Sequence, residues 1–267
     1  MQDGGYMTEP QTDAGQTDAT PTDMTTESFA VINASAGSGV VLVCEHASAA
    51  IPDALDNLGL AATDLLSHAV WDPGALAVAK GLARRLDAVL VAGSVSRLVV
   101  DLNRASDAPD VMPARTERIP VPGNAGLDAA AISERMARYH APFHDALDHV
   151  LNERQNPVLV TIHSFTPVWN GTSRDVEIGV LHDSDTRLAD ALLRLAPDHM
   201  PHEVQRNQPY GPGDGVTHTL CAHALPQGRA NVMLEIRNDL IATPAQQAGM
   251  TETLARWIGA ALAGGTP

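Results

Sequence analysis

The stretch NPVLVTIHSFTPVWNG, residues 156–171, joins an apolar run to a histidine and then to a polar segment that contains proline. A short apolar run rich in valine and isoleucine, bounded by turn residues, is typical of a buried strand. In open α/β sheets, ligands bind beyond the carboxyl ends of the strands. Because His163 lies where the run ends, we expect either a metal ligand at the carboxyl edge of a sheet or a hydrogen-bonded loop residue.

Similar apolar runs alternate with amphipathic stretches along the rest of the chain. The runs predict further strands at residues 39–46, 176–183 and 230–240, and two strands within 88–104. The amphipathic stretches predict helices at residues 74–87, 127–155, 185–197 and 243–262. Pro142 should start a new turn or kink the second helix, and residues 105–127 and 205–230 are predicted to be long loops. Strands that alternate with helices indicate an α/β sandwich with a largely parallel or mixed sheet.

Composition restricts the possible classes of function. The 267 residues carry a formal net charge of -15, which opposes a nucleic-acid partner, since phosphate binding is driven by clustered lysine and arginine. No apolar run approaches the roughly 20 residues needed to cross a bilayer, so no membrane partner is expected. The two cysteines, Cys44 and Cys221, lie far apart in the sequence, which suits a reducing cytoplasm.

The N-terminal segment differs in composition from the body of the chain. It is rich in Thr, Asp, Gly and Pro, and it has neither the basic nor the apolar region of a signal peptide. Such a segment cannot bury enough apolar area to offset its chain entropy. We therefore expect a disordered acidic tail over residues 1–36 and a single α/β domain over residues 37–267.

Polar residues that end the predicted strands are the candidates for a functional site. They are Glu45 and His46, Asp101 to Arg104, His163, His182 and Asp183, and Glu235 to Arg237. Taken singly, most are compatible with an ordinary loop or surface residue. Glu235 is harder to explain in this way, because it lies between Leu234 and Ile236 and a buried carboxylate needs a cation or hydrogen-bond donors.

Three segments resemble the site of the zinc carboxypeptidases, in the same order along the chain. They are VDLNR at 100–104, TIHSF at 161–165 and MLEIR at 233–237. The resemblance implies that Asn103 and Arg104 hold a substrate carboxylate. It also implies that His163 binds zinc and that Glu235 activates the metal-bound water.

A second family accounts better for the early histidine. Carboxypeptidases have His-x-x-Glu, whereas Ala49 lies three residues after His46. The segments VCEHASAAIP, HAVWDPGALAVA, SRLVVDLNR, IHSFTPVWNG, NQPYG and LEIRNDLI are together similar to the N-formylglutamate amidohydrolase family, over most of residues 40–260. This resemblance implies a phosphorylase/hydrolase-like (zinc carboxypeptidase-like) fold, which is an α/β three-layer sandwich with a central mixed sheet. It also implies that Asp72 is the second metal ligand.

These residue types suit a catalytic metal. Zinc in enzymes usually has three protein ligands and one open position, and His46, Asp72 and His163 would hold Zn²⁺ or another divalent metal in this way. Adjacent strand residues point to opposite faces, so Glu45 is expected to orient a ligand histidine, with direct ligation as the alternative. Further candidates for substrate contact are Arg97, Asn207 and Tyr210.

Other polar residues fit these schemes less well. Ser164 beside His163 suggests a serine hydrolase, but the sequence contains no G-x-S-x-G motif. His140 and His144 share a helix face at a spacing that could bind metal. The intervening sequence is not the His-Glu-x-x-His of metalloproteases, so we interpret both as ordinary helix residues.

The residues and the resemblance together predict a cytoplasmic, zinc-dependent amidohydrolase. Its expected partner is a small anionic N-acyl amino acid, nominally N-formyl-L-glutamate, cleaved to formate and L-glutamate by metal-activated water with Glu235 as general base. The sequence predicts no oligomeric state. One alternative is a metallopeptidase or peptidoglycan amidase on the same scaffold, which would need an open groove. Another is a non-catalytic carboxylate-binding protein, which would bind no metal.

Overall fold

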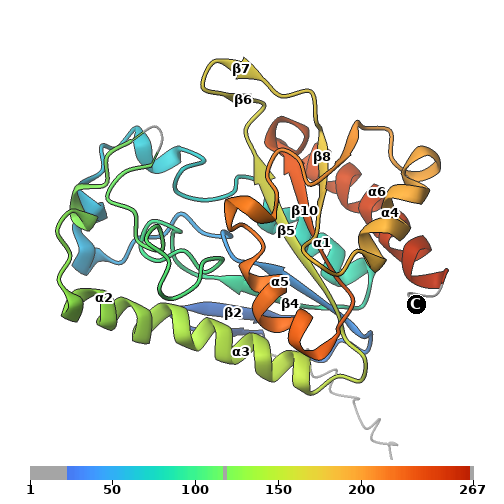
Figure 1. Ribbon diagram of the computed structural model, residues 1–267, viewed down its shortest axis with the longest axis horizontal. Coiled ribbons are helices and arrows are strands. Elements are labelled where there is room, and N and C mark those ends of the chain that lie inside the picture. The colour runs from blue at the N-terminus through green and yellow to red at the C-terminus, as the bar shows by residue number, and fades with distance from the viewer. Residues whose placement is uncertain (1–22, 117–118, 265–267) are drawn as a thin grey trace, which may run out of the picture.

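The computed structural model describes residues 23–116 and 119–264. Within these residues, eight strands form one mixed sheet in the order β1-β2-β4-β3-β5-β10-β8-β9, with helices on both faces (Figure 1). The strands are β1 (Met24–Thr25), β2 (Phe29–Ile32), β3 (Val40–Cys44), β4 (Val89–Gly93), β5 (Val158–Phe165), β8 (Ile178–Leu181), β9 (Val204–Arg206) and β10 (Asn231–Arg237). The hairpin β6 (Val168–Trp169) and β7 (Thr172–Ser173) stands apart from this sheet. The predicted three-layer α/β sandwich with a central mixed sheet is confirmed.

The centre of the sheet is parallel and is covered on both sides. β4, β3, β5 and β10 are parallel neighbours, while β10 pairs antiparallel with β8. Successive residues of β3 enter opposite layers, because Leu42 packs in one core cluster and Val41 and Val43 in the other. Burial on both faces explains why these strands are continuous apolar runs.

Helices that lie far apart in the sequence form the two outer layers. One layer contains α1 (Ala75–Arg85), α4 (Arg187–His199) and α6 (Pro244–Ala263), and the other contains α2 (Ala129–Arg135), α3 (Ala141–Asn152) and α5 (His218–His223) (Figure 1). A π-helical turn, Met136–His140, joins α2 to α3, and Pro142 lies in the first turn of α3. All four predicted helices are therefore confirmed. None of the described helices is both long enough and apolar enough to span a bilayer.

The predicted end of the N-terminal tail is wrong. Residues 1–22 lie outside the described residues, but β1 and β2 fall within the segment predicted to be disordered. β2 pairs antiparallel with β4, and this pairing buries Phe29 and Val31. A short apolar run can add to a sheet edge through ladder hydrogen bonds and burial. The polar average composition of residues 1–36 hid this run.

The second strand predicted within residues 88–104 is also wrong. β4 ends at Gly93, and residues 94–104 form turns. The backbone N–H of Ser96 donates to the carbonyl of Ala50, and that of Asp101 donates to the carbonyl of Val111. The segment is thus buried with its hydrogen bonds satisfied outside the sheet. Its irregular path carries residues 101–104 to the carboxyl ends of the central strands.

The two predicted long loops are only partly irregular. In the first, a 3-10 turn at Pro122–Asn124 is anchored by Asn124, which donates to the carbonyl of Leu98 and accepts from Arg135. Residues 117–118 of this loop lie outside the described residues. The second predicted loop contains most of β9 and the whole of α5, because its polar composition hides these short elements.

The close approach of β4 to the end of β3 provides a test of the fold. A Cβ atom at Gly93 would overlap the carbonyl oxygen of Glu45 and lie 2.8 Å from Cδ1 of Leu102. We expect Gly93→Ala to lower the free energy of unfolding by roughly 1–3 kcal/mol through overpacking. Gly259→Ala in α6 is the matched control. It meets no atom within 4 Å and should gain about 0.5–1 kcal/mol in helix propensity. Equal stabilities of the two variants in urea unfolding would contradict this contact.

Candidate active site

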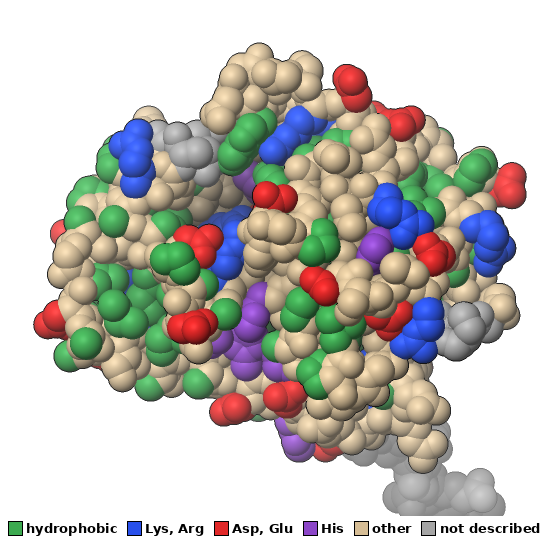
Figure 2. Space-filling view, viewed as in Figure 1, with side chains coloured by type: hydrophobic (Ala, Val, Ile, Leu, Met, Phe, Trp, Pro, Cys, Tyr) green, Lys and Arg blue, Asp and Glu red, His purple; other side chains and the backbone are tan. Residues whose placement is uncertain are grey.

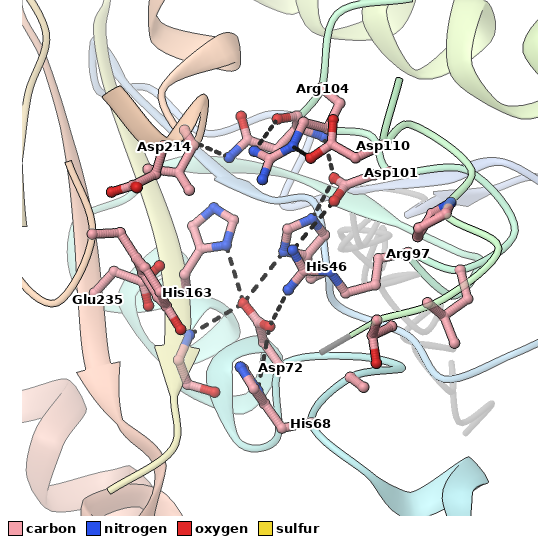
Figure 3. Close-up of a pocket in the computed structure, with 18 of the residues that line it drawn as sticks. His46, His68, Asp72, Arg97, Asp101, Arg104, Asp110, His163, Asp214 and Glu235 are labelled. Atoms are coloured by element: carbon pink, nitrogen blue, oxygen red, sulfur yellow. Dashed lines mark hydrogen bonds and ion pairs between the residues drawn. The ribbon is translucent and has the colours of Figure 1, made fainter. Parts of the chain in front are cut away.

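Four segments that are distant in the sequence meet at the carboxyl ends of the central strands (Figure 3). Glu45 and His46 follow β3, while His163 lies in β5 directly opposite Glu235 of β10. Residues paired across neighbouring strands project to the same face of the sheet. Asp72 comes from the loop before α1 and donates its backbone N–H to the carbonyl of His46. The sheet and this loop therefore bring the predicted metal ligands and Glu235 to one place.

His46, Asp72 and His163 form a compact group of metal-binding side chains. One ligand atom of each lies within 4.8 Å of the others, and all three residues are buried. The Oδ2 atom of Asp72 lies 3.0 Å from Nδ1 of His163 and 3.5 Å from Nδ1 of His46. Two imidazoles and one carboxylate are a donor set that zinc accepts in enzymes.

The far nitrogen of each imidazole faces another carboxylate. Nε2 of His46 lies 2.7 Å from Asp101, and Nε2 of His163 lies 3.0 Å from Glu45. Because a carboxylate only accepts hydrogen bonds, Asp101 keeps the proton of His46 on Nε2, and a neutral His46 ring has its lone pair on Nδ1. His163 has a carboxylate at each nitrogen, and its hydrogen bond runs from Nδ1 to Asp72. A cation beside Asp72 would therefore take the lone pair of His46 directly and would replace the Nδ1 proton of His163. Carboxylates behind ligand histidines fix their orientation in many metal sites.

This arrangement attracts positive charge. Burial lowers the pKa of His163, but Glu45 and Asp72 outweigh it and hold that pKa well above the usual range. Conversely, the neighbouring histidines hold the pKa of Asp72 well below its usual range despite burial. Nδ1 of His46 is buried and has no hydrogen-bond partner among the described residues. A cation bound by Nδ1 of both histidines and by Asp72 would satisfy all of these groups, so the residues fit a metal.

Glu235 lies beside this group and has a different electrostatic environment. Its side chain is buried, and Oε2 has no hydrogen-bond partner among the described residues. Burial, reinforced by the charge of Asp72, raises the pKa of Glu235 to about 7, although His163, Arg97 and His46 act in the opposite direction. A carboxyl group with a pKa near neutral pH can both accept and donate a proton.

Arg97 is the cation closest to these carboxylates. Nη1 lies 3.4 Å from Asp72, and Nη2 lies 3.2 Å from Asp101. His68 lies 3.7 Å from the same oxygen of Asp72 as Arg97, and burial lowers its pKa to about 4. Asp101 and His68 were given no role from the sequence, although both lie in the segments that carry the family resemblance. The position of Asp101 immediately before the Leu-Asn-Arg sequence could have identified it as a site residue.

The predicted substrate-binding residues divide into two groups. Arg97, Asn103, Arg104 and Tyr210 line the cavity, whereas Asn207 is not among its lining residues. The amide of Asn103 is already engaged, because it donates to the carbonyl of Val216 and accepts from the backbone N–H of Thr219. Oδ1 of Asn207 accepts from the backbone N–H of His182. Both asparagines therefore hold loop backbone in place.

Arg104 and Tyr210 present polar atoms at the wall of the cavity. Arg104 donates through Nε to Asp110 and through Nη1 to the carbonyl of Gly215. The hydroxyl of Tyr210 accepts from Arg174, and burial raises the pKa of Tyr210. Of the nitrogens of Arg104, Nη2 makes no hydrogen bond to the described residues and can bind a ligand.

The cavity has the size of a small-molecule site. Its volume is about 360 Å³, at the lower end of the range for such sites. Both long loops contribute walls, the first through Asp110 and Arg115 and the second through Asp214 and Val216. Figure 2 shows a hollow on this face, with basic side chains inside it.

The fold and this cavity together define an α/β protein with a small-molecule site that carries possible metal-binding side chains. The chain belongs to the N-formylglutamate amidohydrolase family, whose pattern matches residues 38–242. It is similar to the crystal structure of a gene product from Agrobacterium tumefaciens, with 51% sequence identity and a TM-score of 0.87 over 90% of this chain and 96% of that one. The crystal structure of the N-formylglutamate amidohydrolase from Ralstonia eutropha JMP134 shares the fold, with 18% sequence identity and a TM-score of 0.64. The match covers 87% of this chain and 96% of that one. No curated protein matches the chain.

The raised pKa of Glu235 predicts an unusual dependence of stability on pH. The folded state retains a proton that the unfolded state releases between the ordinary glutamate pKa of 4.5 and about 7, so this residue reduces stability as the pH rises through that window. We expect Glu235→Gln to become more stable than wild type by roughly 3 kcal/mol at pH 8 in metal-free protein, with a smaller advantage at pH 5.

Glu45→Gln is the matched control, because the histidines lower the pKa of Glu45 despite burial and its ionised form stabilises the fold at higher pH. Both the folded and the unfolded wild type are ionised at this position above pH 5, so the stability deficit of Glu45→Gln should stay nearly constant from pH 5 to pH 8 and shrink only below pH 4.5. Urea unfolding in the presence of a chelator measures both variants. A pH-independent difference between Glu235→Gln and wild type would refute the assigned protonation.

Proposed function

We propose that the protein is a metal-dependent amidohydrolase that cleaves a small N-acyl amino acid, nominally N-formyl-L-glutamate to formate and L-glutamate. Family membership supports the reaction class. One observation carries the metal dependence. The buried histidines 46 and 163 are each held by a carboxylate at Nε2 and face a single oxygen of Asp72 with Nδ1. Zn²⁺ is the first choice, since two imidazoles and a carboxylate suit it.

The metal and the chain's own residues have separate tasks in this proposal. Bound by His46, Asp72 and His163, a divalent cation would polarise the amide carbonyl and make water more acidic. Asp101 keeps His46 in the tautomer that presents Nδ1, and Glu45 would hold the Nε2 proton of His163 once a cation replaces the proton on Nδ1. Asp72 contributes an ionised oxygen even at low pH, since its pKa is held well below the usual range.

Glu235 is the proposed general base and acid. It lies next to His163 across the strand pair and lines the cavity, and its Oε2 atom has no hydrogen-bond partner among the described residues. Glu235 would take a proton from the attacking water and pass it to the nitrogen of the departing amino acid. A pKa of about 7 suits both transfers, because the optimal pKa of such a group lies near the working pH.

Arg104 is the proposed anchor for the substrate carboxylate. Its guanidinium is held by Asp110 and by the carbonyl of Gly215, which leaves Nη2 for the ligand. Asn103 would position the late loop rather than contact the substrate, and Tyr210 would close the opposite wall. Arg97 supplies positive charge near the reacting end. This local charge offsets the long-range repulsion between an anionic substrate and a protein of net charge -15.

Both alternative functions have less support. A metallopeptidase or peptidoglycan amidase needs an open groove, whereas a cavity of about 360 Å³ walled by two loops favours a small substrate. A non-catalytic carboxylate-binding protein does not account for the buried group of His46, Asp72 and His163 at the pocket, with Glu235 beside it. We also propose a cytoplasmic location, in keeping with two free cysteines.

Metal removal and a single substitution test the proposed mechanism. We expect a chelator to abolish hydrolysis of N-formyl-L-glutamate and Zn²⁺ to restore it. Glu235→Gln should keep the metal but lose roughly 10²–10⁴-fold in kcat, the usual contribution of a general acid-base group. The measurement is turnover on a panel of N-formyl and N-acetyl amino acids, together with metal analysis. Full activity of the metal-free enzyme, or of Glu235→Gln, would eliminate the mechanism.

The assignment of the carboxylate anchor has its own test. We expect Arg104→Gln to raise KM for N-formyl-L-glutamate by roughly 10–100-fold with a smaller effect on kcat, because a charge-assisted pair is lost. Arg115→Gln is the control, since Arg115 also lines the cavity but lies exposed on the first loop. Steady-state kinetics distinguish the two. A larger KM effect at Arg115 would move the anchor to that residue.

A further inference from the structure

A second group of histidines lies outside the active site, where α3 meets α5. His140 ends the π-helical turn, His144 lies one turn further along α3, and His218 is the first residue of α5. One ring nitrogen of each lies within 4.8 Å of the others. Figure 2 shows histidine side chains gathered on this face, where α3 and α5 meet in Figure 1. The group is therefore open to ions from solvent.

A relay of hydrogen bonds orients His144. Asp148 lies 2.6 Å from Nδ1 of His223, and Nε2 of His223 lies 2.7 Å from Nδ1 of His144. The carboxylate accepts from Nδ1 of His223, so Nε2 of a neutral His223 accepts the proton of His144. The lone pair of His144 is then on Nε2, which is buried and makes no hydrogen bond of good geometry to the described residues, although the backbone of Leu102 lies near the ring. Leaving such an atom unsatisfied is costly.

The other two rings also have a nitrogen to offer. Nε2 of His140 lies 3.0 Å from the carbonyl oxygen of Arg104. A carbonyl accepts hydrogen bonds, so His140 is protonated at Nε2 and has its lone pair on Nδ1. The ring of His218 makes no hydrogen bond to any residue in the described ranges, and its centroid lies 6.4 Å from that of His140 and 5.5 Å from that of His144.

The environment keeps these rings neutral. Burial, followed by the neighbouring histidines, lowers the pKa of His144 to about 2. Burial is also the main cause that lowers the pKa of His140 and His218. Neutral imidazole is the form that binds metals.

We propose that His140, His144 and His218 bind a divalent cation that prefers imidazole ligands, with Zn²⁺ as the first choice. Three histidines are an established zinc donor set, and imidazole also suits copper and nickel. Asp148 acts through His223 as the carboxylate behind a ligand histidine. This site is separate from the active-site group of His46, Asp72 and His163.

The position of the cation suggests a structural effect on the cavity. His218 is adjacent to Thr219, whose backbone N–H is held by Asn103, and Asn103 also binds the carbonyl of Val216 in the cavity wall. A cation shared with His140 and His144 would fasten this part of the late loop to α3. It would thereby hold one wall of the substrate cavity in place.

Counting bound metal in matched variants tests the proposal. Metal-free protein is titrated with Zn²⁺, and bound metal is measured by native mass spectrometry and elemental analysis. We expect two equivalents in wild type, one in His218→Ala and two in His149→Ala. His149 is the control because it lies exposed on α3 and pairs only with Glu153. Loss of the His218 ring removes no hydrogen bond, so folding should be retained, which circular dichroism checks.

An Asp72→Ala background separates the two sites. This variant should retain one equivalent of Zn²⁺, and Asp72→Ala combined with His218→Ala should bind none. The remaining equivalent can be replaced by Co²⁺, whose absorption spectrum should show nitrogen ligation and disappear with His144→Ala. If His218→Ala binds as much metal as wild type, the second site is overturned, whether or not the active site binds a metal. If wild type binds a single equivalent that His218→Ala loses, the second site stands and the active-site metal fails.

Discussion

The buried carboxylate of Asp72 is the constraint on which the site depends. An ionised carboxylate at the edge of an apolar sheet is tolerated only when donors and cations surround it. Oδ2 of Asp72 accepts the backbone N–H of Ser164 and contacts both His46 and His163, while Oδ1 faces Arg97. These partners come from the ends of β3 and β5 and from the irregular segment after β4, so satisfying one charge fixes the relative positions of three parts of the chain.

The same field of charges gives neighbouring carboxyl groups different roles. Asp101, which has His46 and Arg97 as close partners, has its pKa lowered far below the usual range despite burial, and it remains an acceptor that orients a ring. Glu235 faces the same cavity, but burial dominates and raises its pKa to about 7. The distance of a carboxylate from Arg97 and the histidines, rather than its residue type, thus sets its pKa. Asp101 stays ionised, whereas Glu235 can exchange a proton near neutral pH.

The sequence predicted the central strands and all four long helices, because buried strands and amphipathic helices leave a clear apolar pattern. It also predicted that His46, Asp72, His163 and Glu235 converge, because the segments shared with the family contain these polar residues. It failed where tertiary contacts override local pattern. The apolar residues 95–102 are typical of a strand, yet their backbone groups bond to loops. The loop-holding role of Asn103 could not be predicted either, since its partners Val216 and Thr219 lie more than a hundred residues away.

The active site and the second histidine group follow one physical rule with different consequences. In each, a carboxylate behind an imidazole fixes which nitrogen is free: Asp101 does so for His46, and Asp148 does so for His144 through His223. Of these two groups, the first includes a carboxylate, Asp72, and lies with Glu235 at the cavity, so the proposed hydrolysis is assigned to it. Residues 101–104 touch both groups, since Asp101 orients His46 and the carbonyl of Arg104 contacts His140. A cation at the proposed site between α3 and α5 would therefore lie against the same short segment that orients His46.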